Sequence, residues 1–177
     1  MSLLEIHEPG QTPLPHAGEG SLAVGIDLGT TNSVVAIARE GKPAALHDET
    51  GRSLVPSVVA YPLSGGVLVG DAARQLLARE PRNVVASIKR LMGRGAADLH
   101  AVAGVIPYEI EPGTGQNDMV KLRVGGKARS PVEISAEILK ALRARAEAAL
   151  DKTVERAVIT VPAYFDDAAR AATRDAA

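Results

Sequence analysis

Short apolar segments separated by turn-forming residues fill the chain between residues 22 and 70. The connecting stretches "GTTN", "REGK" and "LSGG" have the length and the residue types of hairpin turns. This succession predicts strands that pair with their neighbours in a mostly antiparallel sheet. The expected strands cover residues 22–28, 33–39, 43–47, 54–62 and 67–70.

Two short helices are predicted to follow these strands. The first covers residues 71–80 and starts at Asp71, a residue type that is frequent at N-caps. The second covers residues 83–93 and ends at Gly93, a typical helix stop. After it, a hairpin-like region at roughly 106–124 closes at the turn "GGK".

A long helix is predicted from a capping signal near residue 130. Ser130 and Glu133 form a capping box, and Pro131 takes the first helical position. The apolar residues that follow recur at a spacing of about 3.6, which is typical of a helix that packs on a core through one face. This stripe consists of Ile138, Leu139, Leu142, Ala146, Ala149 and Leu150.

The last part of the chain predicts one strand and one helix. The run "RAVITVP" at 156–162 is almost entirely apolar after its first residue, which is typical of a strand buried in the centre of a sheet. The segment 166–177 begins with an aspartate cap and shows no stop signal before Ala177. We therefore expect the chain to be the front part of a longer protein.

Composition and charge narrow the class of protein. The chain is 46% hydrophobic and 23% charged with a net charge of −1, so nothing favours nucleic acid or an acidic membrane surface as a partner. No apolar run is long enough to cross a bilayer, and the chain has no cysteine for a disulfide or a thiolate metal site. Residues 1–20 are rich in proline and glycine and lack the features of a secretory signal. We predict a flexible arm there and a cytoplasmic protein.

The first candidate site is the turn in "VGIDLGTTNSVVAIA", residues 24–38. Asp27 ends an apolar strand, and an unpaired carboxylate buried there costs several kcal/mol. Gly29 allows close backbone approach, and the turn N–H groups with the hydroxyls of Thr30 and Thr31 can cradle phosphate oxygens. Asp27 can then hold a hydrated Mg²⁺ or orient a water. The alternative is an ordinary tight turn whose aspartate bonds its own loop, and residue types alone leave both open.

The second candidate is Lys89, within the predicted helix 83–93. Val85 and Met92 lie four residues before and three residues after it, so the lysine shares a helical face with apolar residues. Such a lysine either extends its charged end to solvent or meets a buried anion.

A third candidate region joins the strand at 156–162 to the last helix. Pro162 interrupts the strand and can serve as a pivot, while Arg170, one turn into the helix, can fasten it. Asp166 and Asp167 near the helix start suit the helix dipole, which is a purely structural explanation for both.

Three motifs in order give the chain a specific resemblance. They are "GIDLGTTNS" at 25–33, "IKRLMGR" at 88–94 and "VITVPAYFDDA" at 158–168. Together they resemble the seventy-kilodalton heat-shock chaperones, the DnaK family. The resemblance implies an α/β chain with the actin-like ATPase (ribonuclease H-like) fold. Residues 21–177 would form the first lobe of its nucleotide-binding domain, a mixed sheet with helices, truncated at the C-terminal end.

Smaller features point to the iron–sulfur-assembly branch of this family. The arm "LLEIHEPG" resembles the N-terminal extension of that branch, and Val34 and "FDDA" point the same way. The resemblance implies an ATP-dependent chaperone that acts on an iron–sulfur scaffold protein with a J-domain co-chaperone. The alternative is a general folding chaperone that binds unfolded client peptides. A small-molecule kinase and an actin-like filament subunit share the fold and are remoter alternatives.

The resemblance also implies roles for individual residues. Asp27 would join the metal and water network around the phosphates of ATP or ADP, with Mg²⁺ as the cofactor and K⁺ as a further candidate ion. Lys89 would approach the γ-phosphate and the attacking water, so Asp27 and Lys89 are expected as two buried opposite charges in one cleft. The first phosphate-binding loop would be Gly29, Thr30, Thr31 and Asn32.

Two further roles concern communication within the parent protein. Pro162 and Arg170 would match the family's proline switch and its arginine, which relay the nucleotide state. The second phosphate loop and the catalytic glutamate of the family would follow residue 177. The resemblance therefore implies that the parent is an ATPase and that this chain alone is inactive.

Overall fold

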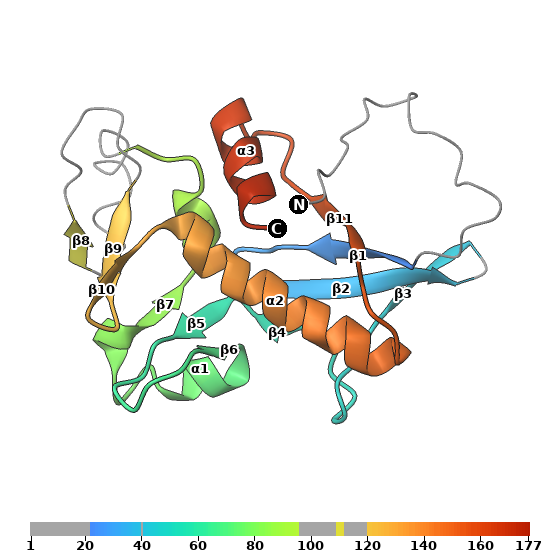
Figure 1. The fold of residues 1–177 in the computed structure, drawn as a ribbon, viewed down its shortest axis with the longest axis horizontal. Coiled ribbons are helices and arrows are strands. Elements are labelled where there is room, and N and C mark those ends of the chain that lie inside the picture. The colour runs from blue at the N-terminus through green and yellow to red at the C-terminus, as the bar shows by residue number, and fades with distance from the viewer. Residues whose placement is uncertain (1–21, 40, 96–108, 112–119) are drawn as a thin grey trace.

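The largest sheet of the computed structural model joins strands from both ends of the chain (Figure 1). The structure describes residues 22–39, 41–95, 109–111 and 120–177. In this sheet β1 pairs antiparallel with β2 and parallel with β11, so the sheet is mixed, as the resemblance implies. The strand pairs formed within residues 22–70 are antiparallel, as predicted. Its members are β1 (Ala23–Asp27), β2 (Asn32–Arg39), β3 (Lys42–Ala45), β4 (Val55–Pro56) and β11 (Arg156–Thr160).

The sheet is packed through one face because its central strands alternate. In β1, Val24 and Ile26 are buried whereas their neighbours are exposed, and β2 buries Val35 and Ile37 while Val34 and Ala36 between them are only half-buried. Figure 1 shows α2 (Pro131–Leu150) lying across this sheet, and the buried residues of both form one core.

The long helix confirms the sequence prediction at its start. The Glu133 N–H donates to Ser130 Oγ at 3.1 Å, and the Ser130 N–H donates to Glu133 Oε2 at 2.6 Å, which is the predicted capping box. The expected stripe is buried through Ala146, whereas Ala149, in the last turn of the helix, is exposed and Leu150 is half-buried. Buried residues of this helix include Ile134, Ile138, Leu139, Leu142 and Ala146.

The remaining described strands form two smaller three-stranded sheets. One is ordered β6–β5–β7 and the other β10–β9–β8. The predicted strand at 54–62 is therefore two strands, β4 in the main sheet and β5 in a second one, divided at Ser57. The bounds are β5 Val58–Ala60, β6 Leu68–Val69, β7 Val84–Ala86, β8 Glu109–Glu111, β9 Lys121–Val124 and β10 Lys127–Arg129.

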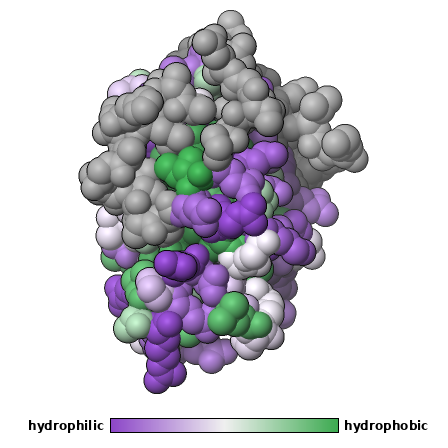
Figure 2. All heavy atoms as spheres, turned by 90° about the vertical axis from the view of Figure 1, so that its left-hand side faces the viewer, coloured by the Kyte–Doolittle hydropathy of each residue, from purple (hydrophilic) through white to green (hydrophobic). Residues whose placement is uncertain are grey.

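The predicted hairpin at 106–124 is found only in part. β8 does pair antiparallel with β9, but the "GG" turn joins β9 to β10, a strand that was not predicted. Residues 106–108 and 112–119 of that prediction lie outside the described residues. Figure 2 faces this end of the molecule and shows hydrophilic side chains with separate hydrophobic patches among them.

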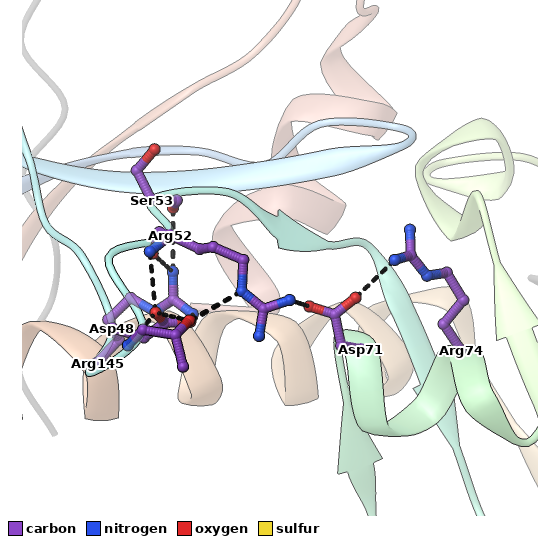
Figure 3. Close-up of polar contacts among 7 residues, drawn as sticks. Asp48, Arg52, Ser53, Asp71, Arg74 and Arg145 are labelled. Carbon is purple, nitrogen blue, oxygen red and sulfur yellow. Dashed lines mark hydrogen bonds and ion pairs between the residues drawn. The ribbon is translucent and has the colours of Figure 1, made fainter.

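The first predicted helix is shorter than expected. α1 spans Asp71–Gln75 only, and Asp71 is its first helical residue, because the N-cap is Gly70 at φ 76°. The Asp71 carboxylate makes no cap; it binds the guanidinium groups of Arg52 at 2.8 Å and Arg74 at 2.7 Å (Figure 3). The prediction of Asp71 as an N-cap is therefore wrong by one position.

The second predicted helix is wrong. Residues 84–86 form β7, Ser87 takes a left-handed conformation at φ 58°, and only Ile88–Leu91 turn as a 3-10 helix, η2. A second 3-10 turn, η1, covers Pro81–Asn83. The β-branched pair Val84–Val85 is buried against β5, and this strand pairing overrides the helical spacing.

An ordered loop is fastened to the long helix beside the main sheet. Arg145 of α2 donates to the carbonyl oxygens of Arg52 and Ser53 and to Asp48 Oδ2 (Figure 3). Bonds from the Thr50 hydroxyl and the Arg52 N–H lower the pKa of Asp48 to about 2. The loop at 48–53 is therefore held by a carboxylate that stays ionised over the physiological range.

The last strand and helix differ in how well they were predicted. β11 lies at an edge of the main sheet, and Val158 is 68% exposed, so the expected burial in a sheet centre is not found in the described residues. The helix α3 (Asp167–Asp175) does have an aspartate N-cap, because Asp166 accepts a bond from the Ala169 N–H. Within the described residues, no helix has both the length and the apolarity that crossing a membrane requires.

Candidate functional site

The turn between β1 and β2 has room for glycine alone at its second position. A Cβ on Gly29 would lie 2.0 Å from the carbonyl oxygen of Asn32, which is far inside contact distance. Thr30 is half-buried, and Thr31 and Asn32 are exposed. The turn is therefore a tight, open backbone loop that can accept a ligand against it. The Gly29 N–H is already used, because it donates to Ser33 Oγ at 3.1 Å.

Two serines under this turn were not singled out by the sequence. Ser33 Oγ and Ser57 Oγ are 2.9 Å apart, and each side chain is 1% exposed. Ser33 belongs to the quoted motif "GIDLGTTNS", so the motif itself was a signal, but no local pattern pairs it with Ser57.

Asp27 ends β1 with its side chain exposed, so the predicted burial of this carboxylate is wrong. The alternation of β1 explains this, since Asp27 points to the opposite face from Ile26 and Leu28. Across the parallel pair, the Thr160 hydroxyl donates to Asp27 Oδ1 at 3.1 Å. The C-terminal ends of β1 and β11 thus present a carboxylate and a hydroxyl side by side.

Lys89 lies near this carboxylate, half-buried in η2. Burial lowers the pKa of Lys89, and the charge of Asp27 opposes that shift. Its Nζ stands over the ring of Phe165, 5.5 Å from the ring centroid. Val85 and Met92 are buried, but they do not share a helix face with Lys89 as predicted, because this segment is a strand, a turn and a 3-10 helix.

Pro162 and Arg170 meet through Phe165. The Phe165 N–H donates to the Pro162 carbonyl at 3.1 Å, and Arg170 Nε donates to the Phe165 carbonyl at 3.1 Å. Since Lys89 lies over the same ring, Phe165 contacts all three predicted residues. The sequence offered one signal for it, since it is the single phenylalanine of the chain and stands inside the third motif.

Gly93 fixes the turn that carries Lys89 directly against α3. Its φ is 69°, and a Cβ there would lie 2.4 Å from the Ala169 nitrogen and 2.6 Å from the Ala169 Cα. The stop residue predicted from the sequence is therefore also the point where the backbone of one segment touches that of another.

The donor set fits a magnesium ion of the kind that nucleotides bring with them. Among the described residues, no three histidine or carboxylate side chains come together as a ready-made metal cage. Mg²⁺ commonly uses one or two carboxylates, with waters and phosphate oxygens supplying the rest. Asp27 is one exposed carboxylate beside an open turn, which matches that need.

Comparisons with known proteins identify the family of this chain. The family model described as "Hsp70 protein" matches residues 23–177. Proteins named "Chaperone protein HscA homolog" from Burkholderia thailandensis and from Azoarcus sp. strain BH72 are each 54% identical over 177 residues. Both matches cover 100% of this chain and 28% of the relative, so the chain spans little more than a quarter of these proteins. The chain belongs to the Hsp70 family, whose members have the actin-like ATPase fold.

Proposed function

We propose that this chain is the first lobe of the nucleotide-binding domain of an ATP-dependent chaperone of the iron–sulfur-assembly branch. In this proposal residues 1–20 are an arm and residues 21–177 form the lobe. The family match begins at residue 23, whereas the likeness to the HscA homologues extends over the whole chain, including the arm. That difference supports the branch as well as the family, and it disfavours the kinase and filament alternatives.

The observation that carries the proposal is the half-buried Lys89 beside Asp27 and the open turn. A desolvated ammonium attracts a polyphosphate more strongly than an exposed one, because fewer waters and ions screen it. We assign Lys89 the stabilisation of negative charge as the γ-phosphate is transferred to water. A lysine that served only to keep the surface soluble would not need a position in which burial disfavours its charged form.

The turn and Asp27 complete the assignment on this side of the nucleotide. Gly29, Thr30, Thr31 and Asn32 form the first phosphate-binding loop, and Asp27 holds Mg²⁺ directly or through water. When bound, Mg²⁺ neutralises part of the phosphate charge. The Thr160 hydroxyl orients the Asp27 carboxylate through its hydrogen bond to Oδ1.

Pro162 and Arg170 are proposed as the relay of the nucleotide state to the rest of the parent protein. The contacts through Phe165 support this assignment, since Lys89, Pro162 and Arg170 all touch that residue. A phosphate that draws the Lys89 ammonium toward it changes the contact with the Phe165 ring. Such a change reaches both Pro162 and Arg170 through the Phe165 backbone.

The partners follow from the branch. We propose a J-domain co-chaperone and an iron–sulfur scaffold protein as partners of the complete protein. A scaffold-derived peptide that stimulates its ATPase supports this specificity. Stimulation by unrelated unfolded peptides alone would instead support a general folding chaperone.

The test of the ATP site uses Lys89→Ala in the complete protein, with Lys152→Ala as the matched control because Lys152 is an exposed lysine elsewhere. We expect Lys89→Ala to lower the single-turnover hydrolysis rate by about 10²–10³-fold, the usual cost of removing a transition-state charge stabiliser. Lys152→Ala should leave the rate unchanged.

The same assay on the 177-residue chain should show no Lys89-dependent turnover, because the proposal places the opposite wall of the site elsewhere in the parent. Two results contradict the proposal. One is an unchanged rate in the complete Lys89→Ala protein, and the other is nucleotide-specific turnover by the chain alone that Lys89→Ala abolishes.

A further inference from the structure

The two serines below the turn at 29–32 form a buried pair of hydroxyl groups. Their Oγ atoms are 2.9 Å apart, and both side chains are almost completely removed from solvent. A buried hydroxyl without a partner costs free energy that a solvated one does not. Each buried hydroxyl therefore has the other as a hydrogen-bond partner.

This pair holds the turn at both of its ends. At the start, the Gly29 N–H donates to Ser33 Oγ at 3.1 Å. At the end, the Ser57 N–H donates to the Thr31 carbonyl at 2.8 Å. Ser57 thus acts on the turn twice, through its hydroxyl by way of Ser33 and through its own backbone.

The position of Ser57 in the fold makes it a rigid support. It stands between β4, which pairs with β2 in the main sheet, and β5, which belongs to the second sheet. Residues 55–60 are all buried. Ser57 therefore moves only if strands of two sheets move with it, which suits a residue that holds a binding loop in place.

We propose that Ser57 is a positioning residue for the phosphate-binding turn. This inference rests on the proposed function, since it takes the turn to bind nucleotide phosphates. Ser57 does not touch the nucleotide. It keeps Ser33 Oγ aimed at the Gly29 N–H, and through that bond it keeps the turn in the tight shape that only glycine permits.

The test compares Ser57→Ala, Ser33→Ala and the double variant in the complete protein that carries this chain. Ser135→Ala is the matched control, because Ser135 is also a fully buried serine with one hydroxyl contact, to Met92 Sδ at 3.2 Å. Two quantities are measured for each variant. One is amide hydrogen exchange of the segment 28–33 without nucleotide, and the other is the Kd for Mg·ATP.

We expect Ser57→Ala to speed exchange in the segment 28–33 and to raise the Kd for Mg·ATP by about fivefold to tenfold, the equivalent of one net hydrogen bond. The double variant should bind no more weakly than Ser33→Ala alone, because both changes break one chain of contacts. Ser135→Ala should leave both quantities unchanged, whatever it costs in overall stability.

A Ser57→Ala protein with the exchange pattern and Kd of the Ser135→Ala control overturns the inference. Additive losses in the double variant also overturn it, since they would show that the two serines act separately. If the unmodified protein binds no Mg·ATP, the proposed function fails instead. The exchange measurement then still decides whether Ser57 holds the turn.

Discussion

At the scale of single residues, burial decides which charged and polar groups are unusual. Asp27 stands at the end of an apolar strand but is exposed, whereas Lys89 is half-buried and its pKa is lowered by desolvation. Outside the candidate site, Tyr61 is a buried polar side chain with a shifted pKa. Its ring stacks under the Arg129 guanidinium at 3.9 Å, and its buried hydroxyl has no hydrogen-bond partner among the described residues.

Tyr61 should make stability fall at alkaline pH. Burial raises the pKa of Tyr61 from 10.0 to about 12, and this exceeds the opposing effect of Arg129. Between about pH 10 and pH 12, the Tyr61 hydroxyl therefore keeps its proton in the folded state and loses it in the unfolded state. The contribution to stability is complete below pH 10 and is lost progressively as pH rises towards about 12.

The measurement is urea unfolding at neutral pH and at about pH 11. Tyr61→Phe should remove this alkaline loss, and at neutral pH it should cost little because no hydrogen bond is broken. Tyr164→Phe is the control, since Tyr164 is 79% exposed. Equal alkaline losses in the unmodified protein and in Tyr61→Phe would contradict the prediction.

At the scale of elements, the sequence predicted correctly those features that depend on contacts between residues close together in the chain. The capping box at Ser130–Glu133 and the Asp166 cap are confirmed, because each is a contact between residues three positions apart. The helix at 83–93 is wrong, because its start pairs with β5, and that partner lies more than twenty residues earlier. Helical spacing carries no information about such a partner.

The residues of the candidate site show the same difference between local motifs, which the sequence reveals, and contacts between distant segments, which it does not. Asp27 and the turn were visible as a motif, and the structure places Lys89 close enough for Asp27 to affect its pKa. Ser57 and Phe165 were missed, because their roles come from contacts with residues distant in sequence. The exposure of Val158 was also missed, since an apolar run looks the same in an edge strand and in a central one.

The junction between η2 and α3 leads to a prediction about Gly93. Gly93→Ala should destabilise the protein by about 1–3 kcal/mol, because the added methyl meets the α3 backbone in a left-handed conformation. It should also move Lys89 away from Phe165. Chemical denaturation measures the first effect, and the NMR shift of the Lys89 side chain, which lies over an aromatic ring, reports the second.

Gly66→Ala is the matched control for this change. Gly66 has a similar φ of 83°, but a Cβ there would meet nothing within 4 Å. The difference between the two variants therefore isolates the contact with α3 from the backbone strain that both share. Equal destabilisation with an unchanged Lys89 signal would show that the contact does not position the lysine.

At the scale of the whole molecule, the main sheet ends on one side at β11, a strand edge with exposed apolar side chains. No described strand pairs with the outer edge of β11, and its Val158 and the nearby Tyr164 are exposed. An unpaired strand edge next to apolar side chains favours association with another strand. In the relatives, which are more than three times as long, further chain is available to cover such an edge.

The 177-residue chain should therefore associate with itself through β11. We expect concentration-dependent dimers or larger species in sedimentation velocity, and Val158→Lys should reduce them because a charge on an edge strand opposes pairing. Leu63→Lys serves as the control, since Leu63 is 84% exposed but lies outside the strands. A chain that stays monomeric, or that responds equally to both variants, would contradict this prediction.

The open edge of β11 also offers a place to divide and reassemble the protein. An unpaired strand edge can accept a strand from a second polypeptide, which then pairs along it through backbone hydrogen bonds. Under the proposed function, the nucleotide would then lie between two separately expressed pieces. Reassembly of the pieces would become a readout of ATP, with Val158 marking the surface along which they join.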